Sequence, residues 1–120
     1  MTRIALSTLI VAVLATAAVL ASAQAAIPIL KGEVGPGFTI KVTKAGKAVR
    51  KLKAGTYKLK VEDKADTHNF HLFGPGVNKW TTVAFVGVKT WKIRLKPGKY
   101  TYQCDPHAEN GMLGTFRVIR

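Results

Sequence analysis

The stretch Thr101–Gly114 reads TYQCDPHAENGMLG and holds a cysteine, a histidine and a methionine within nine positions. It starts like a strand, continues into a short loop, and ends where a second strand begins. One such loop can present a thiolate, an imidazole and a thioether to the same point. The stretch therefore predicts a metal site at one end of a β structure.

The predicted ligands are Cys104, His107 and Met112 from this stretch, and His68 from an earlier hydrophobic stretch. Two imidazoles, a thiolate and a weak axial thioether form the ligand set of a blue (type 1) copper centre. We therefore expect one copper ion that transfers single electrons, and no enzymatic activity. A thiolate and base pair of Cys104 and His107 is the catalytic alternative, but no third orienting group or substrate pocket is evident.

Two histidines compete for the fourth ligand position. If Phe70 and Leu72 face the core, strand alternation places His68 on the same face and His71 on the opposite one. His68 is then the ligand, and His71 is an ordinary solvent-facing imidazole. A bulge near Asn69 would reverse this choice.

The segment His68–Phe70 and the Cys104–Met112 loop, with its Cys-x2-His-x4-Met spacing, resemble the corresponding motifs of the cupredoxins, the family of plastocyanin, amicyanin and azurin. The turns at Gly74–Asn78 and Leu95–Tyr100 resemble those of small secreted bacterial members, so the resemblance covers most of residues 26–120. It implies an all-β, Greek-key β-sandwich. Asp105 departs from the pattern, since many cupredoxins carry Ser or Thr after the ligand cysteine, and an anion there would affect the redox potential and docking.

The resemblance also implies roles for residues around the ligands. The second histidine ligand, here His107, lies at the surface in this family, within an apolar patch that redox partners contact. The expected patch residues are Pro106, Met112, Leu113, Phe73 and Pro75. The side chain of Asn69 is expected to tie the segment of the first ligand to the Cys104 loop.

The N-terminal segment predicts export. Arg3 supplies a positive charge, Ile4–Leu20 is apolar and rich in alanine, and Ala23–Ala25 offers small residues at a cleavage site. We expect residues 1–25 to be a cleaved signal peptide, and residues 26–120 to form one secreted or periplasmic cupredoxin-like copper-binding domain. An uncleaved membrane anchor is the alternative, but the alanine and threonine content makes the run weakly hydrophobic.

Residues 26–120 suffice for one small domain with a single core. The single cysteine of the chain, Cys104, cannot form an internal disulfide, so it is a free thiol, an intermolecular bridge or a metal ligand. The neighbouring histidine and methionine favour the metal ligand. A buried core cysteine would not explain why both residues follow it.

Apolar and polar residues alternate as in half-buried strands. The clearest runs are Phe38–Thr43, Tyr57–Glu62 and Trp91–Lys96. Turns rich in glycine and proline separate them, which favours an antiparallel sandwich. The basic segment Lys44–Ala54 is either a short strand or only a loop.

The chain has 19 basic and 6 acidic residues and a formal charge of +13. This charge predicts acidic redox partner proteins and attraction to an anionic envelope surface. Nucleic-acid binding is the alternative for so basic a chain, but export argues against it, and we expect a monomer. Two other classes stay open: a copper storage or delivery protein, and a structural or binding module that holds metal incidentally.

Overall fold

The computed structural model describes residues 10–18 and 25–120. The predicted signal peptide lies largely outside the described residues, so its cleavage stays a prediction. Among the residues that are described, no helix has both the length and the apolar character needed to cross a membrane.

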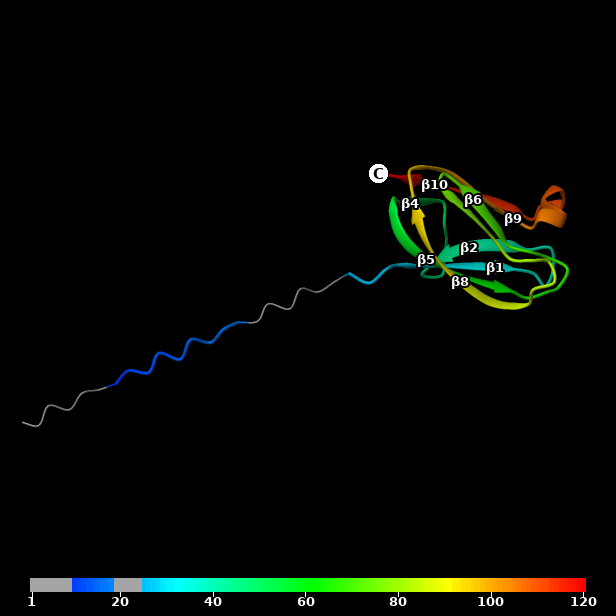
Figure 1. Ribbon diagram of the computed structural model, residues 1–120. Helices are drawn as coiled ribbons and strands as arrows, with labels where there is room; N and C mark the ends of the chain where they lie inside the picture. The colour runs from blue at the N-terminus through cyan, green and yellow to red at the C-terminus, as the bar shows by residue number, and fades with distance from the viewer. Residues whose placement is uncertain (1–9, 19–24) are drawn as a thin grey trace, which may run out of the picture.

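From Ile29 onward, the described chain forms two five-stranded sheets packed face to face (Figure 1). The first sheet contains, in spatial order, β3 (Lys47–Ala48), β2 (Ile40–Lys44), β1 (Ile29–Val34), β5 (Gly55–Asp63) and β8 (Gly87–Leu95). The second contains β4 (Lys51–Lys53), β10 (Leu113–Ile119), β9 (Gly98–Gln103), β6 (His71–Gly74) and β7 (Val77–Trp80). One short 3-10 helix, η1 (Asp105–Asn110), joins β9 to β10. The predicted all-β, cupredoxin-like sandwich is confirmed.

Most strand pairs are antiparallel, as the turn spacing favoured, but two are parallel, so both sheets are mixed. β1 pairs in parallel with β5, and β4 pairs in parallel with β10. Parallel neighbours need a crossover connection, and the excursion through β2, β3 and β4 supplies one between β1 and β5. The uncertain segment Lys44–Ala54 holds the short strands β3 and β4, which lie in opposite sheets.

The core follows the predicted alternation. In β5, Tyr57, Leu59 and Val61 are buried while the intervening Lys58 and Lys60 are exposed. The largest fully buried side chains include Leu30, Leu59, Phe70, Leu72, Leu95 and Tyr100. Phe38 departs from the expected pattern: it precedes β2 and is 62% exposed. The reason is a turn closed by the Gly35 N–H bond to the Thr39 carbonyl (2.9 Å), which delays the strand until Ile40.

The two ends of the sandwich are built differently. At one end, which we call the loop end, lie the β1–β2 turn, the segment between β5 and β6, and η1 (Figure 1, right). Strand β9 runs toward this end and β6 starts from it. Cys104 directly follows β9 and His68 lies shortly before β6, so the topology brings both residues to the loop end. At the opposite end lie the β3–β4 connection and the β8–β9 turn.

Candidate metal centre

Three predicted ligand atoms converge at the loop end. The Sγ atom of Cys104 lies 3.4 Å from Nδ1 of His107 and 3.7 Å from Nδ1 of His68. The two Nδ1 atoms lie 3.0 Å apart. These residues form a group that can hold a metal ion, and Cys104 and His68 are buried while His107 is half-buried.

Backbone hydrogen bonds shape the loop that carries Cys104, His107 and Met112. Cys104 N–H donates to the Met112 carbonyl (3.0 Å), and Met112 N–H donates to the His107 carbonyl (3.3 Å). Gly111 closes η1 with a φ of 91°, in the left-handed region that glycine adopts without steric cost. Met112, the fourth predicted ligand, is thereby held beside the other two loop residues, and its side chain is fully buried.

A hydrogen bond fixes the ring of His68. Its Nε2 lies 3.2 Å from the Pro36 carbonyl, which can only accept, so Nε2 carries the proton and Nδ1 keeps its lone pair. Such a bond on the far nitrogen orients a histidine ligand. Gly35 permits this contact, because it has a φ of +70° and an added Cβ would lie 3.0 Å from Cδ2 of His68.

Strand alternation accounts for the inward position of His68 only in part. β6 begins at His71, and His68, Asn69 and Phe70 before it are all buried. His68 therefore reaches the metal centre from an irregular segment and not from the inward face of a strand.

Phe38 lies at the metal centre, which the sequence reasoning missed. Its ring packs edge-on against His107 (centroids 4.8 Å apart) and His68 (5.5 Å). The alternation of apolar and polar residues around β2 predicted that Phe38 lies in the core. No other sequence feature indicated a contact between Phe38 and the two histidines. The exposed phenyl ring shields the outer side of the two imidazoles.

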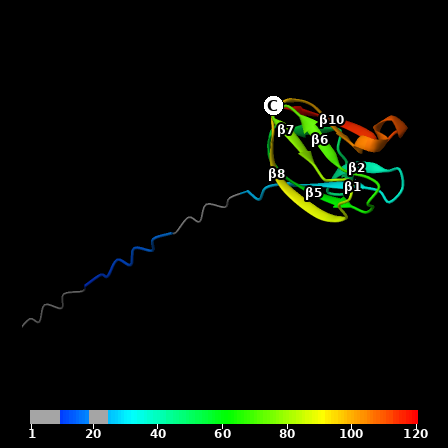
Figure 2. The ribbon, with the colours of Figure 1, turned by 45° about the vertical axis from the view of Figure 1, so that its right-hand side comes forward.

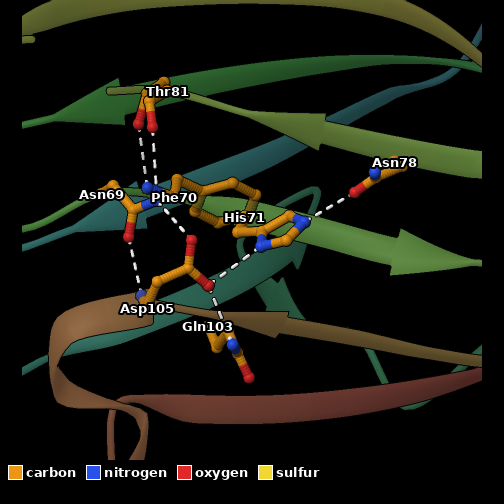
Figure 3. Close-up of polar contacts among 7 residues, drawn as sticks. All are labelled: Asn69, Phe70, His71, Asn78, Thr81, Gln103 and Asp105. Atoms are coloured by element: carbon orange, nitrogen blue, oxygen red, sulfur yellow. Dashed lines mark hydrogen bonds and ion pairs between the residues drawn. The ribbon is translucent and has the colours of Figure 1, made fainter. Parts of the chain in front are cut away.

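The segment before β6 and the Cys104 loop are tied together by Asn69 and Asp105 (Figure 3). Asp105 N–H donates to Oδ1 of Asn69 (2.7 Å), and Nδ2 of Asn69 donates to Oδ2 of Asp105 (2.9 Å). This is the link that the resemblance implied. Asp105 follows Cys104 and Asn69 follows His68, so these hydrogen bonds hold the two ligand segments in a fixed relative position.

The carboxylate of Asp105 also accepts hydrogen bonds at its other oxygen, from Nε2 of Gln103 and Nδ1 of His71 (both 2.9 Å). Partial burial by itself raises the pKa of Asp105, but the hydrogen bonds from Gln103, Asn69 and His71 outweigh it and hold the pKa below its usual value. Asp105 is therefore an anion within an ordered network at neutral pH.

His71 is part of this network, so its prediction as an ordinary solvent-facing imidazole is wrong. Its side chain is only 22% exposed. The ring lies between Asp105 and Asn78, with Nε2 2.6 Å from Oδ1 of Asn78 (Figure 3). His71 thus contacts the carboxylate of Asp105 and is not among the three residues that converge at the metal centre.

A second buried network supports the same segment from inside. The Thr81 hydroxyl accepts a hydrogen bond from Phe70 N–H (2.9 Å) and donates to Oδ2 of Asp63 (3.1 Å). Burial raises the pKa of Asp63, opposed by hydrogen bonds from Ala65 N–H and Thr81. No sequence pattern pointed to Asp63 or Thr81, because their burial depends on contacts across the two sheets.

The expected apolar patch is only partly present. Pro106 and Leu113 are exposed beside His107, but Met112 is fully buried and contributes no surface. Pro75 packs against Gly98 at the opposite end. Phe73 packs against His71 on the outer face of β6. Around the metal centre, the exposed apolar residues therefore include Pro106 and Leu113, together with Phe38. Val83 and Val86, in the connection between β7 and β8, are also exposed at the loop end.

The donor set fits a copper ion. Metal bonds of about 2.0 to 2.3 Å to nitrogen and sulfur, at tetrahedral to trigonal angles, place neighbouring donors about 3.3 to 3.8 Å apart. The two sides of the triangle at Cys104 lie within this range, and the side between His68 and His107 is shorter. A thiol sulfur with two imidazole nitrogens is the combination that suits copper in both oxidation states.

Comparison with protein families agrees with this fit. Residues 15–119 match the model of the copper binding proteins of the plastocyanin/azurin family, and the chain belongs to this family. Its cofactor is a single copper ion of the type 1 kind. A comparison with curated proteins gives no match.

Solved structures with a similar fold include reduced rusticyanin, which has a TM-score of 0.58 and 22% identity over 76% of this chain and 78% of that one. Rusticyanin from Thiobacillus ferrooxidans gives a TM-score of 0.54 and 23% identity over 76% of each chain. Reduced auracyanin from Roseiflexus castenholzii gives 0.56 and 17% identity, covering 80% of this chain and all of that one (100%). At these identities the likeness concerns the fold.

Proposed function

We propose that this protein carries single electrons between redox partners by cycling one copper ion between Cu(II) and Cu(I). His68, Cys104 and His107 are the proposed main ligands, and Met112 is the proposed weak fourth ligand. The observation that carries the proposal is the convergence of Cys104 Sγ and both Nδ1 atoms on one point. The role is not enzymatic, because both groups of a thiolate and base pair would be occupied as ligands.

The surrounding contacts support rapid electron exchange. Copper requires Cys104 as a thiolate and the histidines as neutral imidazoles. The Pro36 carbonyl keeps His68 in the tautomer that leaves Nδ1 free. The bonds of Asn69 to Asp105 hold the two ligand segments together. A site held this firmly keeps nearly the same ligand positions in both oxidation states, so little rearrangement accompanies each transfer.

The proposed route for electrons passes through His107, which is half-buried while the other two main ligands are buried. Redox partners would contact the exposed Phe38, Pro106 and Leu113 around it. Small contacts of this kind are typical of transient electron-transfer encounters. The formal charge of +13 supports partners that are acidic overall. We also propose that the protein is exported, secreted or periplasmic, and monomeric.

The optical spectrum after addition of Cu(II) tests the metal centre. We expect an intense visible thiolate-to-copper band, which Zn(II) cannot produce. Cys104→Ser should abolish the colour and leave the sandwich folded, because serine has a similar volume and no thiolate. His68→Ala should weaken copper binding strongly, whereas His71→Ala should retain the blue colour. A blue Cys104→Ser variant would refute the ligand assignment.

Repeated voltammetry separates an electron carrier from a copper store. The carrier should cycle between Cu(II) and Cu(I) many times without losing metal, and Met112→Leu should shift its potential while copper stays bound. Electron exchange with an acidic partner should slow as ionic strength rises. Loss of copper on the first reduction, or its rapid transfer to an apo-acceptor, would instead establish a delivery protein.

A further inference from the structure

Acidic residues are confined to one half of the sandwich. All six lie in the described part of the chain, in the last residues of β1 and β5, in the segment that leads to His68, or in η1. They are Glu33, Glu62, Asp63, Asp66, Asp105 and Glu109. The metal centre therefore lies at the end that holds the acidic residues of a strongly basic protein.

Basic residues gather at the opposite end, where the chain crosses from β3 to β4. A hollow of about 450 Å³ lies there, and all the charged residues that line it are basic. The exposed residues that we call the basic end are Lys44, Lys47, Arg50, Lys51, Lys53 and Arg117. No acidic side chain lines this hollow, so nothing there neutralises the charge.

The strand register places like charges next to one another. Arg117 pairs with Lys51 on one side and with Lys99 on the other. Like charges directly opposite each other weaken a sheet. Within the described residues these three side chains form no ion pair, whereas Lys31 and Lys41 on the other sheet both pair with Glu33. The positive charges at the basic end therefore repel one another, and a polyanionic ligand would reduce this repulsion.

This ligand cannot be the partner that receives electrons at His107. Lys99 precedes Cys104 by five positions along β9, and at about 3.3 Å per strand residue the two are separated by roughly 17 Å. The β3–β4 connection lies at the same distant end. A molecule bound at the basic end would therefore leave Phe38, Pro106 and Leu113 free.

The N-terminal segment leads into the sandwich from the side of the basic end. Ile29 pairs with Lys58, and Lys58 N–H donates to the Pro28 carbonyl (3.0 Å). Lys58 lies three positions after Gly55, the first residue of β5 at that end. In both ribbon views the described residues directly before β1 lie on the side away from η1 (Figures 1 and 2).

We infer that the basic end docks onto an anionic phospholipid surface and turns the metal centre toward the aqueous space. The cations form a broad exposed array across β4, β10 and the hollow, which suits a layer of phosphate groups better than one small anion. Each lysine or arginine close to such a surface adds its own attraction, and salt screens it. The acidic residues of the loop end would be repelled by the same surface, which favours this orientation.

Vesicle sedimentation tests this inference. The copper-loaded protein, with the N-terminus it carries after export, is mixed with vesicles of phosphatidylcholine alone or with about a third phosphatidylglycerol. We expect binding to the anionic vesicles only, lost at high salt. The triple variant Lys47→Gln, Arg50→Gln, Lys51→Gln should bind roughly a hundredfold more weakly, since each cation contributes about a fivefold effect.

The matched control removes the same charge from the outer face of the first sheet, through Lys58→Gln, Lys60→Gln and Lys92→Gln. It should keep most of the binding, and both triple variants should keep the blue copper band as evidence of folding. Equal loss in both variants would overturn a defined docking end, and equal binding to neutral vesicles would overturn the electrostatic basis. Preferential binding of inorganic phosphate or duplex DNA in competition would replace the lipid surface with that ligand.

Reduction by hydroquinone, a neutral reagent, reports the orientation. The reduction rate of vesicle-bound protein should match that of free protein, because His107 would face the solution. A strong decrease on the vesicles would show that the loop end lies against the lipid and would overturn the orientation. The copper spectrum is independent of this result, so failure here leaves the proposed metal centre intact.

Discussion

Asn69 and Asp105 lie 36 positions apart in the chain and are joined by two hydrogen bonds, of 2.7 and 2.9 Å. Each residue directly adjoins a proposed copper ligand, His68 in one case and Cys104 in the other. The pair therefore fixes the distance between two ligand segments from different parts of the second sheet. Both hydrogen bonds involve the side chain of Asn69, and one of them is donated by the backbone N–H of Asp105. Replacing Asn69 therefore removes both bonds and leaves the sequence of the Cys104 loop unchanged.

Asn69→Ala should destabilise the protein by about 2 kcal/mol, because Asp105 N–H and one carboxylate oxygen lose their partner. Copper affinity should fall by about 10 to 100-fold, as expected when a group that orients the ligands is lost. Urea unfolding and competitive copper titration measure the two effects. An unchanged copper affinity would show that the link is only structural.

Thr81→Val should cost about 2 kcal/mol and shift the copper absorption band. The hydroxyl serves two buried groups at once, Phe70 N–H and the carboxyl of Asp63, and valine satisfies neither. Thr81→Ser keeps the hydroxyl and should restore both the spectrum and most of the stability. If serine fails to restore them, the methyl group and not the hydrogen bonds explains the effect.

Gly35→Ala should lower stability by about 1 kcal/mol or more and weaken copper binding. Its φ of +70° disfavours any side chain, and the new Cβ would press on the ring of His68 at 3.0 Å. Gly37→Ala, two positions away, provides the control because nothing lies within 4 Å of its added Cβ. Thermal unfolding and copper titration of the two variants should differ clearly.

Glu33 should stabilise the fold in a pH-dependent way. Hydrogen bonds from Lys41 and Lys31 lower its pKa from 4.5 to about 2. A lowered folded-state pKa means that the stabilisation is complete above about pH 4.5 and is lost as the pH falls toward 2. Glu33→Gln should therefore cost about 1 kcal/mol at pH 7, and the cost should shrink over this range.

Urea unfolding of the copper-free protein measures this dependence without the competing protonation of copper ligands. Glu62→Gln is a suitable comparison, because Glu62 makes only a 3.8 Å contact with Lys31. A difference between wild type and Glu33→Gln that stays constant from neutral to acidic pH would contradict the assignment.

Local patterns were sufficient to predict the sandwich and the loop that carries the metal centre. Alternation identified the buried faces around Tyr57 and Ile93, because each strand has one face in the core and one in solvent. The spacing of Cys104, His107 and Met112 lies within a single loop, so their proximity required no knowledge of the tertiary structure. The choice of His68 depended on strand alternation, but the regular strand begins only at His71.

Contacts between segments that lie far apart in the chain could not be predicted in this way. Alternation does not reveal strand direction, so the parallel pairing of β1 with β5 was missed. Phe38 reaches the histidines because a turn delays β2, and Asp63 meets Thr81 only after β5 and the segment following β7 come together. His71 was misjudged because its partner Asp105 lies 34 positions away.

The separation of charge between the two ends of the sandwich gives the molecule an electric dipole directed from one end to the other. On a negatively charged electrode the protein would adsorb by Lys47, Arg50 and Lys51, and the copper ion would face the electrolyte across the full length of the sandwich. Direct current would then be weak even for a competent carrier. An electrode coated with a neutral, apolar monolayer would instead meet Phe38 and Leu113, and the copper ion would come within tunnelling distance of the conductor.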